Sequence, residues 1–193
     1  MRAGKQQRKT KETDISVAMD LDGCGKHAVH TGIGFFDHML ELLACHSGID
    51  LTVSVKGDLQ VDAHHSVEDV GIVMGKLLHE LLGDKKGIAR YATAYIPMDE
   101  TLARTVLDVS GRPCLVYRVK GLRGKIGEFD AELTEEFLRA VCSYGMLTAH
   151  VEVLYGGNLH HMAEAVFKSF AQALHDAVAV TGNAVPSSKG ILE

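Results

Sequence analysis

An internal repeat constrains the fold of this chain more than any other feature of its sequence. Residues 11–23 align without gaps with residues 99–111, at an offset of 88, and a glutamate, a threonine, an aspartate and a glycine recur at matching places. In both segments apolar residues alternate with polar or small ones before the glycine, which predicts half-buried strands that end in turns. The sequence therefore predicts one domain over residues 1–193, built of two repeats (about 8–87 and 88–182) and a C-terminal tail loop.

Helices and further strands are expected in the same order in each half. Each half is predicted to run strand, strand, helix, strand, helix, a unit that buries one face of a sheet under two helices. Two such units would pack helices against helices. The expected fold is α+β, with internally duplicated half-domains and two sheets sandwiching the helices; the strand order stays open. The predicted helices cover 35–44, 67–82, 134–142 and 162–180, the strands between them cover 51–55 and 150–154, and additional strands are left open at 26–29 and 113–119.

Each half also carries a His-His pair followed by a glutamate at the start of its longer helix. Residues four apart lie on the same face of a helix, so His64 with Glu68, and His160 with Glu164, can each hold one metal ion. The second histidine of each pair points about 100° around the helix and can serve a different ion. Two copies in one chain predict a metal site, and the alternative is two pairs of solvated surface histidines. The second histidines are His65 and His161.

The composition is that of an ordinary soluble globular chain, with 46% apolar residues. No stretch reaches the roughly 18 apolar residues that a membrane span needs, and residues 1–12 are basic and polar without the apolar core of a secretory signal. Four scattered cysteines without a C-x-x-C motif fit reduced thiols in the cytoplasm. The net charge of −5 argues against a nucleic-acid partner, and the eleven histidines are the one anomaly.

Several motifs occur together in this chain: Phe36-Asp37-His38-Met39, the two His-His-x-x-Glu motifs, and residues 96–103, 110–113 and 186–190. In this combination the chain resembles the imidazoleglycerol-phosphate dehydratase family, from about residue 8 to residue 192. The resemblance implies a carbon-oxygen lyase (hydro-lyase) of histidine biosynthesis, which converts imidazole glycerol phosphate to imidazole acetol phosphate.

The same resemblance implies a manganese enzyme built of many identical subunits. It implies about two Mn²⁺ per subunit, although iron, cobalt and zinc accept the same histidine and glutamate ligands. It further implies a homo-oligomer of about twenty-four subunits with cubic symmetry and with active sites between subunits. The expected partners are thus a small phosphorylated imidazole and further copies of the chain, with no nucleic acid and no membrane.

The resemblance carries most of the metal ligands over residue by residue. Glu136 stands where many members have a histidine, and it lies 24 residues before His160 much as His38 lies 26 before His64. Glu136 is therefore kept as a ligand, and His150 is the alternative, with a structural role in a strand as its other interpretation. The expected ligands are His38, His64, His65, Glu68, Glu136, His160, His161 and Glu164.

The implied reaction is difficult because the C–H to be broken lies beside no carbonyl and hydroxide leaves poorly. A metal on the imidazole lowers the pKa of the ring N–H, and the metal-bound imidazolate can expel the hydroxyl group. The resemblance assigns the base to Glu12, with His46 as a second catalytic residue, and arginine and lysine suit the phosphate. The residues expected to bind substrate are Glu12, His38, His46, His64, Glu68, Arg90, Arg112, His160, Ser187 and Lys189.

Other interpretations compete with the dehydratase. The same ligands suit a metal-storage or scaffold cage without turnover, or a dinuclear hydrolase with an activated water. Asp20 and Asp22 follow a strand as in aspartyl-phosphate phosphatases, but the second copy of the repeat lacks the second aspartate, so a strand and turn role is favoured. Lys86 and Lys168 are interpreted as solvated charges, and Glu12 has the alternative of a solvated residue at the start of a strand.

Overall fold

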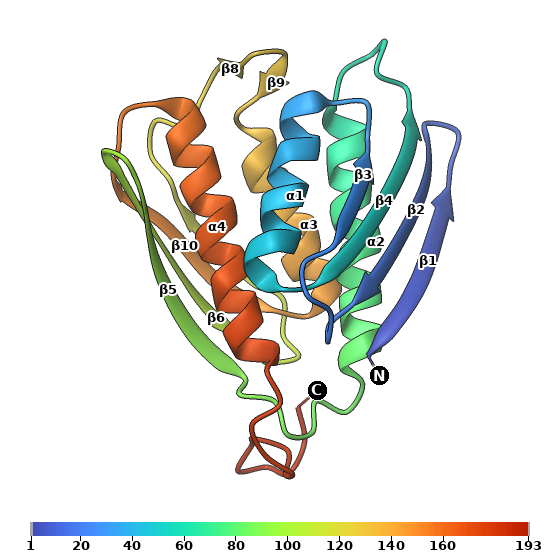
Figure 1. The fold of residues 1–193 in the computed structure, drawn as a ribbon, viewed down its shortest axis with the longest axis vertical. Coiled ribbons are helices and arrows are strands. Elements are labelled where there is room, and N and C mark those ends of the chain that lie inside the picture. Colours follow the sequence, from blue (N-terminus) through green and yellow to red (C-terminus); the bar gives the residue numbers. More distant parts are fainter. Residues whose placement is uncertain (1, 193) are drawn as a thin grey trace.

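The structure, a computed structural model, describes residues 2–192 and confirms the α+β fold, with four helices between two four-stranded sheets (Figure 1). Met1 and Glu193, the ends of the predicted domain, lie outside the described residues. Within this described part, none of the helices is long and apolar enough to cross a membrane. The first half contains β1 (Ala3–Lys9), β2 (Thr13–Asp20), β3 (His27–His30), α1 (Gly34–Ser47), β4 (Asp50–Gly57) and α2 (His64–Leu82).

The second half follows the same order of elements, with one insertion. The insertion is a short hairpin ahead of the third helix. The elements are β5 (Tyr91–Met98), β6 (Thr101–Asp108), β7 (Cys114–Arg118), the hairpin strands β8 (Lys125–Ile126) and β9 (Phe129–Asp130), α3 (Leu133–Gly145), β10 (Thr148–Tyr155) and α4 (Leu159–Val178).

The two sheets have equivalent strand orders, β1-β2-β4-β3 and β5-β6-β10-β7. All neighbours pair antiparallel except β3 with β4 and β7 with β10, which are parallel. On β2 the side chains of Ile15 and Val17 point to the helices and are fully buried, whereas the alternate positions face outward. Each sheet therefore has one apolar face, and the helical layer covers it.

The helices pack in two pairs, α1 against α4 and α2 against α3. The second pair approaches closely because α2 has glycines at the contact. A Cβ atom on Gly71 would lie 2.7 Å from the Cβ of Ala140, and one on Gly75 would lie 2.8 Å from the carbonyl oxygen of Val141. Figure 1 shows that all four helices start at the same end of the molecule, so their N-terminal side chains gather there.

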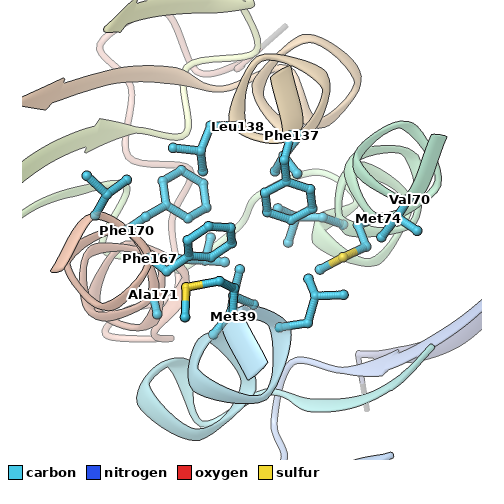
Figure 2. Packing of buried hydrophobic residues seen from close by; sticks show 14 of the residues in the cluster. Met39, Val70, Met74, Phe137, Leu138, Phe167, Phe170 and Ala171 are labelled. Atoms are coloured by element: carbon cyan, nitrogen blue, oxygen red, sulfur yellow. The ribbon is translucent and has the colours of Figure 1, made fainter. Parts of the chain in front are cut away.

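The centre of the helical layer is a cluster of aromatic and sulfur-containing side chains (Figure 2). Phe137 stacks on Phe167 with ring centroids 5.4 Å apart and meets Phe36 edge-on at 5.3 Å. These three side chains are fully buried. Because they come from α1, α3 and α4, this cluster joins the two halves of the chain.

Replacing Phe167 with alanine is expected to destabilise the fold by about 3–5 kcal/mol, because it leaves a cavity at the contact between the halves. Chemical denaturation of the metal-free protein measures this loss. The control is Val61→Ala, since Val61 is 64% exposed and its truncation should change stability little. Equal stability of the two variants would contradict this description of the core.

Some elements differ from those expected from the sequence. The sequence predicts neither the edge strands β1 and β5 nor the β8–β9 hairpin. The helices α2 and α4 start at His64 and Leu159, about one turn earlier than expected, so both His-His pairs are helical. His150 lies in β10, as its structural interpretation expects, and its side chain is exposed on the outer face of this strand.

Candidate functional site

Local capping interactions fix the backbone of both His-His pairs. The Oδ1 atom of Asn158 accepts hydrogen bonds from the backbone N–H groups of His160 (2.9 Å) and His161 (3.3 Å). In the first half, Oδ1 of Asp62 accepts from the N–H of His64 at 2.8 Å. Asn158 is the N-cap of α4, and Asp62 precedes the first turn of α2 by one residue more. Both side chains satisfy backbone N–H groups that are free at a helix start, and the four histidine side chains project from these first turns.

The second-half pair forms a three-residue cluster with α1. The Oε2 atom of Glu164 lies 3.2 Å from Nε2 of His160 and 3.5 Å from Nε2 of His38. One ligand atom from each of the three residues lies within 4.8 Å of the others. Two imidazole nitrogens and a carboxylate oxygen suit Mn²⁺, Fe²⁺ and Zn²⁺, so the donor set fits a divalent cation.

Glu164 is the buried member of this cluster, with 5% of its surface exposed. Burial raises the pKa of the Glu164 carboxyl, but the hydrogen bond and charge of Lys168 and the hydrogen bond with His160 outweigh it, and the pKa lies below its ordinary value. The carboxylate is therefore charged and able to bind a cation at neutral pH.

Lys168 lies one helical turn after Glu164 and contacts its carboxylate. Its side chain is only 19% exposed, and Nζ also lies 3.8 Å from Sδ of Met98. The expectation that Lys168 is a solvated charge is wrong. His46, two turns after His38 on α1, is close enough to be affected: burial and then the charge of Lys168 lower the pKa of His46, against the opposing charge of Glu164.

The first-half pair is more open. Nε2 of His64 lies 3.8 Å from Oε2 of Glu68, and both side chains are about half exposed. Glu136 starts α3 in the place that His38 has on α1, but its Oε2 lies 4.0 Å from Nε of Arg139. Among residues 2–192, no histidine nitrogen comes within 4.0 Å of the Glu136 carboxylate, so the chain alone does not close a second three-residue cluster.

The second histidine of each pair contacts a different carboxylate. Nδ1 of His65 lies 3.0 Å from Oδ2 of Asp58, and Nδ1 of His161 lies 2.7 Å from Oε2 of Glu100. These hydrogen bonds are the largest cause of the raised pKa of each histidine. Asp58 is a residue of this site that the sequence did not reveal.

The two glutamates that the repeat aligns have different surroundings. Glu100 accepts hydrogen bonds at Oε1 from the backbone N–H groups of Asn158 (2.9 Å) and Gly157 (3.2 Å). The Asn158 hydrogen bond, followed by the one to His161, lowers the pKa of Glu100 to about 2. The Glu12 carboxylate is 54% exposed, and its nearest charged neighbour in the described part of the chain is Nε2 of His65 at 4.0 Å.

A buried network holds the turn that carries Glu12. The carboxylate of Asp69, which is 6% exposed, accepts hydrogen bonds from Thr13 Oγ1 (2.5 Å) and from Arg8. Thr10 Oγ1 accepts from the backbone N–H of Glu12 at 3.1 Å. The Glu12 backbone is therefore fixed while its carboxylate stays free to act on a bound molecule.

The residues expected to bind phosphate lie at the opposite end of the molecule. Nε of Arg90 donates to Oδ1 of Asp108 at 2.8 Å, and NH1 donates to the carbonyl of Pro186 at 2.8 Å, which ties the tail to β6. The backbone N–H of Arg90 donates to the carbonyl of Ala177, near the end of α4. With a rise of 1.5 Å per residue, Ala177 lies about 25 Å along α4 from His160.

The other predicted phosphate ligands share this end. Arg112 follows β6 with its side chain exposed, and Ser187 lies in the tail, where its Oγ accepts from the backbone N–H of Lys189 at 3.2 Å. Within one chain, these residues therefore do not meet the histidine cluster.

The fold and the site define a class of α+β proteins with two equivalent sheets and a histidine–carboxylate cluster at the shared helix start. A sequence model of the imidazoleglycerol-phosphate dehydratase family matches residues 31–174. The imidazoleglycerol-phosphate dehydratase of Exiguobacterium sp. is 57% identical over 194 residues, covering 100% of both chains, and that of Azorhizobium caulinodans is 55% identical over 195 residues, covering 100% and 99%.

Solved structures that resemble this chain belong to the same family. The crystal structure of the Staphylococcus aureus imidazoleglycerol-phosphate dehydratase matches with a TM-score of 0.84 at 44% identity, over 94% of this chain and 99% of that one. The Pyrococcus furiosus IGPD structure matches with a TM-score of 0.83 at 33% identity, over 97% and 100%. The chain belongs to the imidazoleglycerol-phosphate dehydratase family, and it is accordingly an enzyme of the hydro-lyase class.

Proposed function

We propose that this chain removes water from imidazole glycerol phosphate to give imidazole acetol phosphate, a step of histidine biosynthesis. The observation that carries the proposal is the cluster of His38, His160 and Glu164 in a chain of this family. A cytoplasmic location, expected from the cysteines, stays a prediction.

The proposal includes about two Mn²⁺ per subunit, with other divalent metals able to replace them. One would be held by the cluster on α1 and α4, whose buried, charged Glu164 supports cation binding. A bound divalent cation supplies Lewis acidity, which lowers the pKa of an imidazole N–H and favours loss of the neighbouring hydroxyl group. The proposed ligands are His38, His64, His65, Glu68, Glu136, His160, His161 and Glu164.

Glu12 is proposed as the base that accepts the substrate proton. A general base needs a free, ionised carboxylate within reach of the substrate. The Glu12 carboxylate is exposed and accessible to a bound molecule, whereas the Glu100 carboxylate accepts hydrogen bonds from the backbone before α4 and from His161. His46 on α1, which is near enough to Lys168 and Glu164 of α4 for their charges to act on it, is proposed to contact the substrate, and its lowered pKa favours a neutral ring that can accept a proton.

The arrangement of the chain supports a homo-oligomer. The residues that are proposed to bind the phosphate are Arg90, Arg112, Ser187 and Lys189. They lie at the end of the molecule where Arg90 contacts Ala177, which is about 25 Å along α4 from His160, a distance that a small phosphorylated imidazole does not span. A complete site then needs two chains, in line with the assembly of about twenty-four subunits that the family resemblance implies. The outer face of the second sheet also exposes Tyr91 and Tyr95 on β5 and Tyr155 on β10, as a subunit contact would.

Removing the metal is expected to abolish turnover. After dialysis against a chelator, formation of the ketone product from imidazole glycerol phosphate should fall below detection, and added Mn²⁺ should restore it. Metal analysis of the same samples gives the number of ions per chain. Full activity of metal-free protein would refute the metal-dependent proposal, metal binding without turnover would favour a storage cage, and cleavage of simple phosphoesters would favour a hydrolase.

A further inference from the structure

In both halves, a carboxylate holds the second histidine of the His-His pair by the same ring nitrogen. Nδ1 of His65 meets Asp58 at 3.0 Å, and Nδ1 of His161 meets Glu100 at 2.7 Å. A carboxylate accepts hydrogen bonds only, so Nδ1 must carry the proton in each pair. The neutral ring then has its lone pair on Nε2.

Each Nε2 is free of a hydrogen bond within residues 2–192. Its nearest carboxylate oxygen lies 4.0 Å away for His65 (Glu12) and 3.7 Å away for His161 (Asp99), beyond hydrogen-bond distance. Both rings are partly exposed at the end of the helical layer. Each half therefore has an imidazole ring whose orientation is fixed by a hydrogen bond at Nδ1 and whose Nε2 lone pair is free to bind a ligand.

The two halves use residues from different places in the repeat. Glu100 lies in the β5–β6 turn, and the repeat aligns it with Glu12 in the β1–β2 turn. In the first half, Asp58, which follows β4, makes the corresponding hydrogen bond with Nδ1 of His65, and the Glu12 carboxylate does not take part in it. Each half of the fold thus contains a carboxylate–histidine pair, and Glu12 belongs to neither pair.

We propose that Asp58 and Glu100 are positioning residues that fix the tautomer and orientation of His65 and His161, so that each Nε2 binds a divalent cation. Partners of this kind commonly tune metal-binding histidines. The inference rests on the proposed metal dependence. It also accounts for the different surroundings of Glu12, because Asp58 holds His65 in the first half and the Glu12 carboxylate is left free to act as the proposed base.

Glu100→Gln tests the proposal sharply, because the structure dictates how the new amide must lie. Its carbonyl oxygen is needed at the position of Oε1, where two backbone N–H groups donate. The NH₂ group then faces Nδ1 of His161 and donates to it, which moves the ring proton to Nε2 and blocks the lone pair. Asp58→Ala removes the acceptor from His65 in the other half.

The measurements are the Mn²⁺ affinity of purified protein and the melting temperature of the metal-free form. Each variant is expected to bind Mn²⁺ about 10–100-fold more weakly at the affected site, with an unchanged melting temperature before metal is added. Long-range ¹⁵N–¹H spectra of the metal-free protein should show the His161 proton moving from Nδ1 to Nε2 in Glu100→Gln. Glu80→Gln, which removes an exposed charge at the far end of α2, is the matched control and should match the unsubstituted protein.

The outcomes separate the two proposals. Unchanged Mn²⁺ affinity in both variants would overturn the positioning role while leaving the metal-dependent enzyme intact. Absence of Mn²⁺ binding by the unsubstituted chain would overturn both. If a variant had both a weaker Mn²⁺ affinity and a lowered melting temperature in its metal-free form, Asp58 and Glu100 would have a structural role, and this result would also refute the inference.

Discussion

Glu12→Gln is expected to lower kcat by about 10²–10⁴-fold while the protein keeps its bound metal. The amide has the shape of the carboxylate but accepts no proton at neutral pH. Glu12 projects from a turn whose backbone is held by Thr10 and, through Thr13, by the buried Asp69, so the substitution should leave the turn in place. Steady-state kinetics with imidazole glycerol phosphate and metal analysis of the same preparation measure the two effects.

Asp14→Asn is the matched control for this experiment. Asp14 is an exposed carboxylate two residues further on, paired with Lys9 at 2.9 Å, and its loss should change kcat by less than about twofold. Normal turnover by the Glu12 variant would remove Glu12 from the mechanism. Loss of turnover with loss of metal would instead make Glu12 part of metal binding.

The inner elements of the fold could be predicted from the sequence, whereas its edges could not. β2 alternates buried Ile15 and Val17 with outward positions, and the long helices have continuous apolar faces. The edge strand β1 contains none of the large apolar residues that mark a strand, since its residues are alanine, glycine, lysine, glutamine and arginine. Strand order is likewise absent from a single sequence, because it depends on which apolar faces meet after the helices pack.

The candidate site could be predicted where it depends on helical spacing and could not be where it depends on tertiary packing. The i, i+4 relation paired His160 with Glu164, and the structure places the two side chains 3.2 Å apart. The approach of His38 to that pair required α1 to pack against α4. Asp58 lacked any signal because it lies in a loop. Lys168 had one, since it stands four residues after Glu164 on the same helix, but the metal-ligand interpretation of Glu164 leaves no place for a lysine partner.

Mixed oligomers of two inactive variants are expected to recover activity if each active site joins opposite ends of two subunits. One variant is Glu12→Gln, altered at the histidine end. The other is Arg112→Ala with Lys189→Ala, altered at the end that is proposed to bind phosphate. Each variant alone should be nearly inactive. The first lacks the proposed base, and the second loses two charge-assisted hydrogen bonds to the phosphate, which costs about 3–6 kcal/mol of substrate binding.

Co-expression of the two variants in equal amounts gives a sharp numerical expectation. In a randomly mixed oligomer, a site receives an intact histidine end with probability one half and an intact phosphate end with probability one half, so about a quarter of the activity should return. Turnover is measured on the co-expressed oligomer and on separately purified variants mixed without exchange, which should stay inactive. If both ends of a site came from one chain, no site in the mixed oligomer would be intact and no activity would return. The 25 Å between the two ends along α4 is the physical reason to expect recovery.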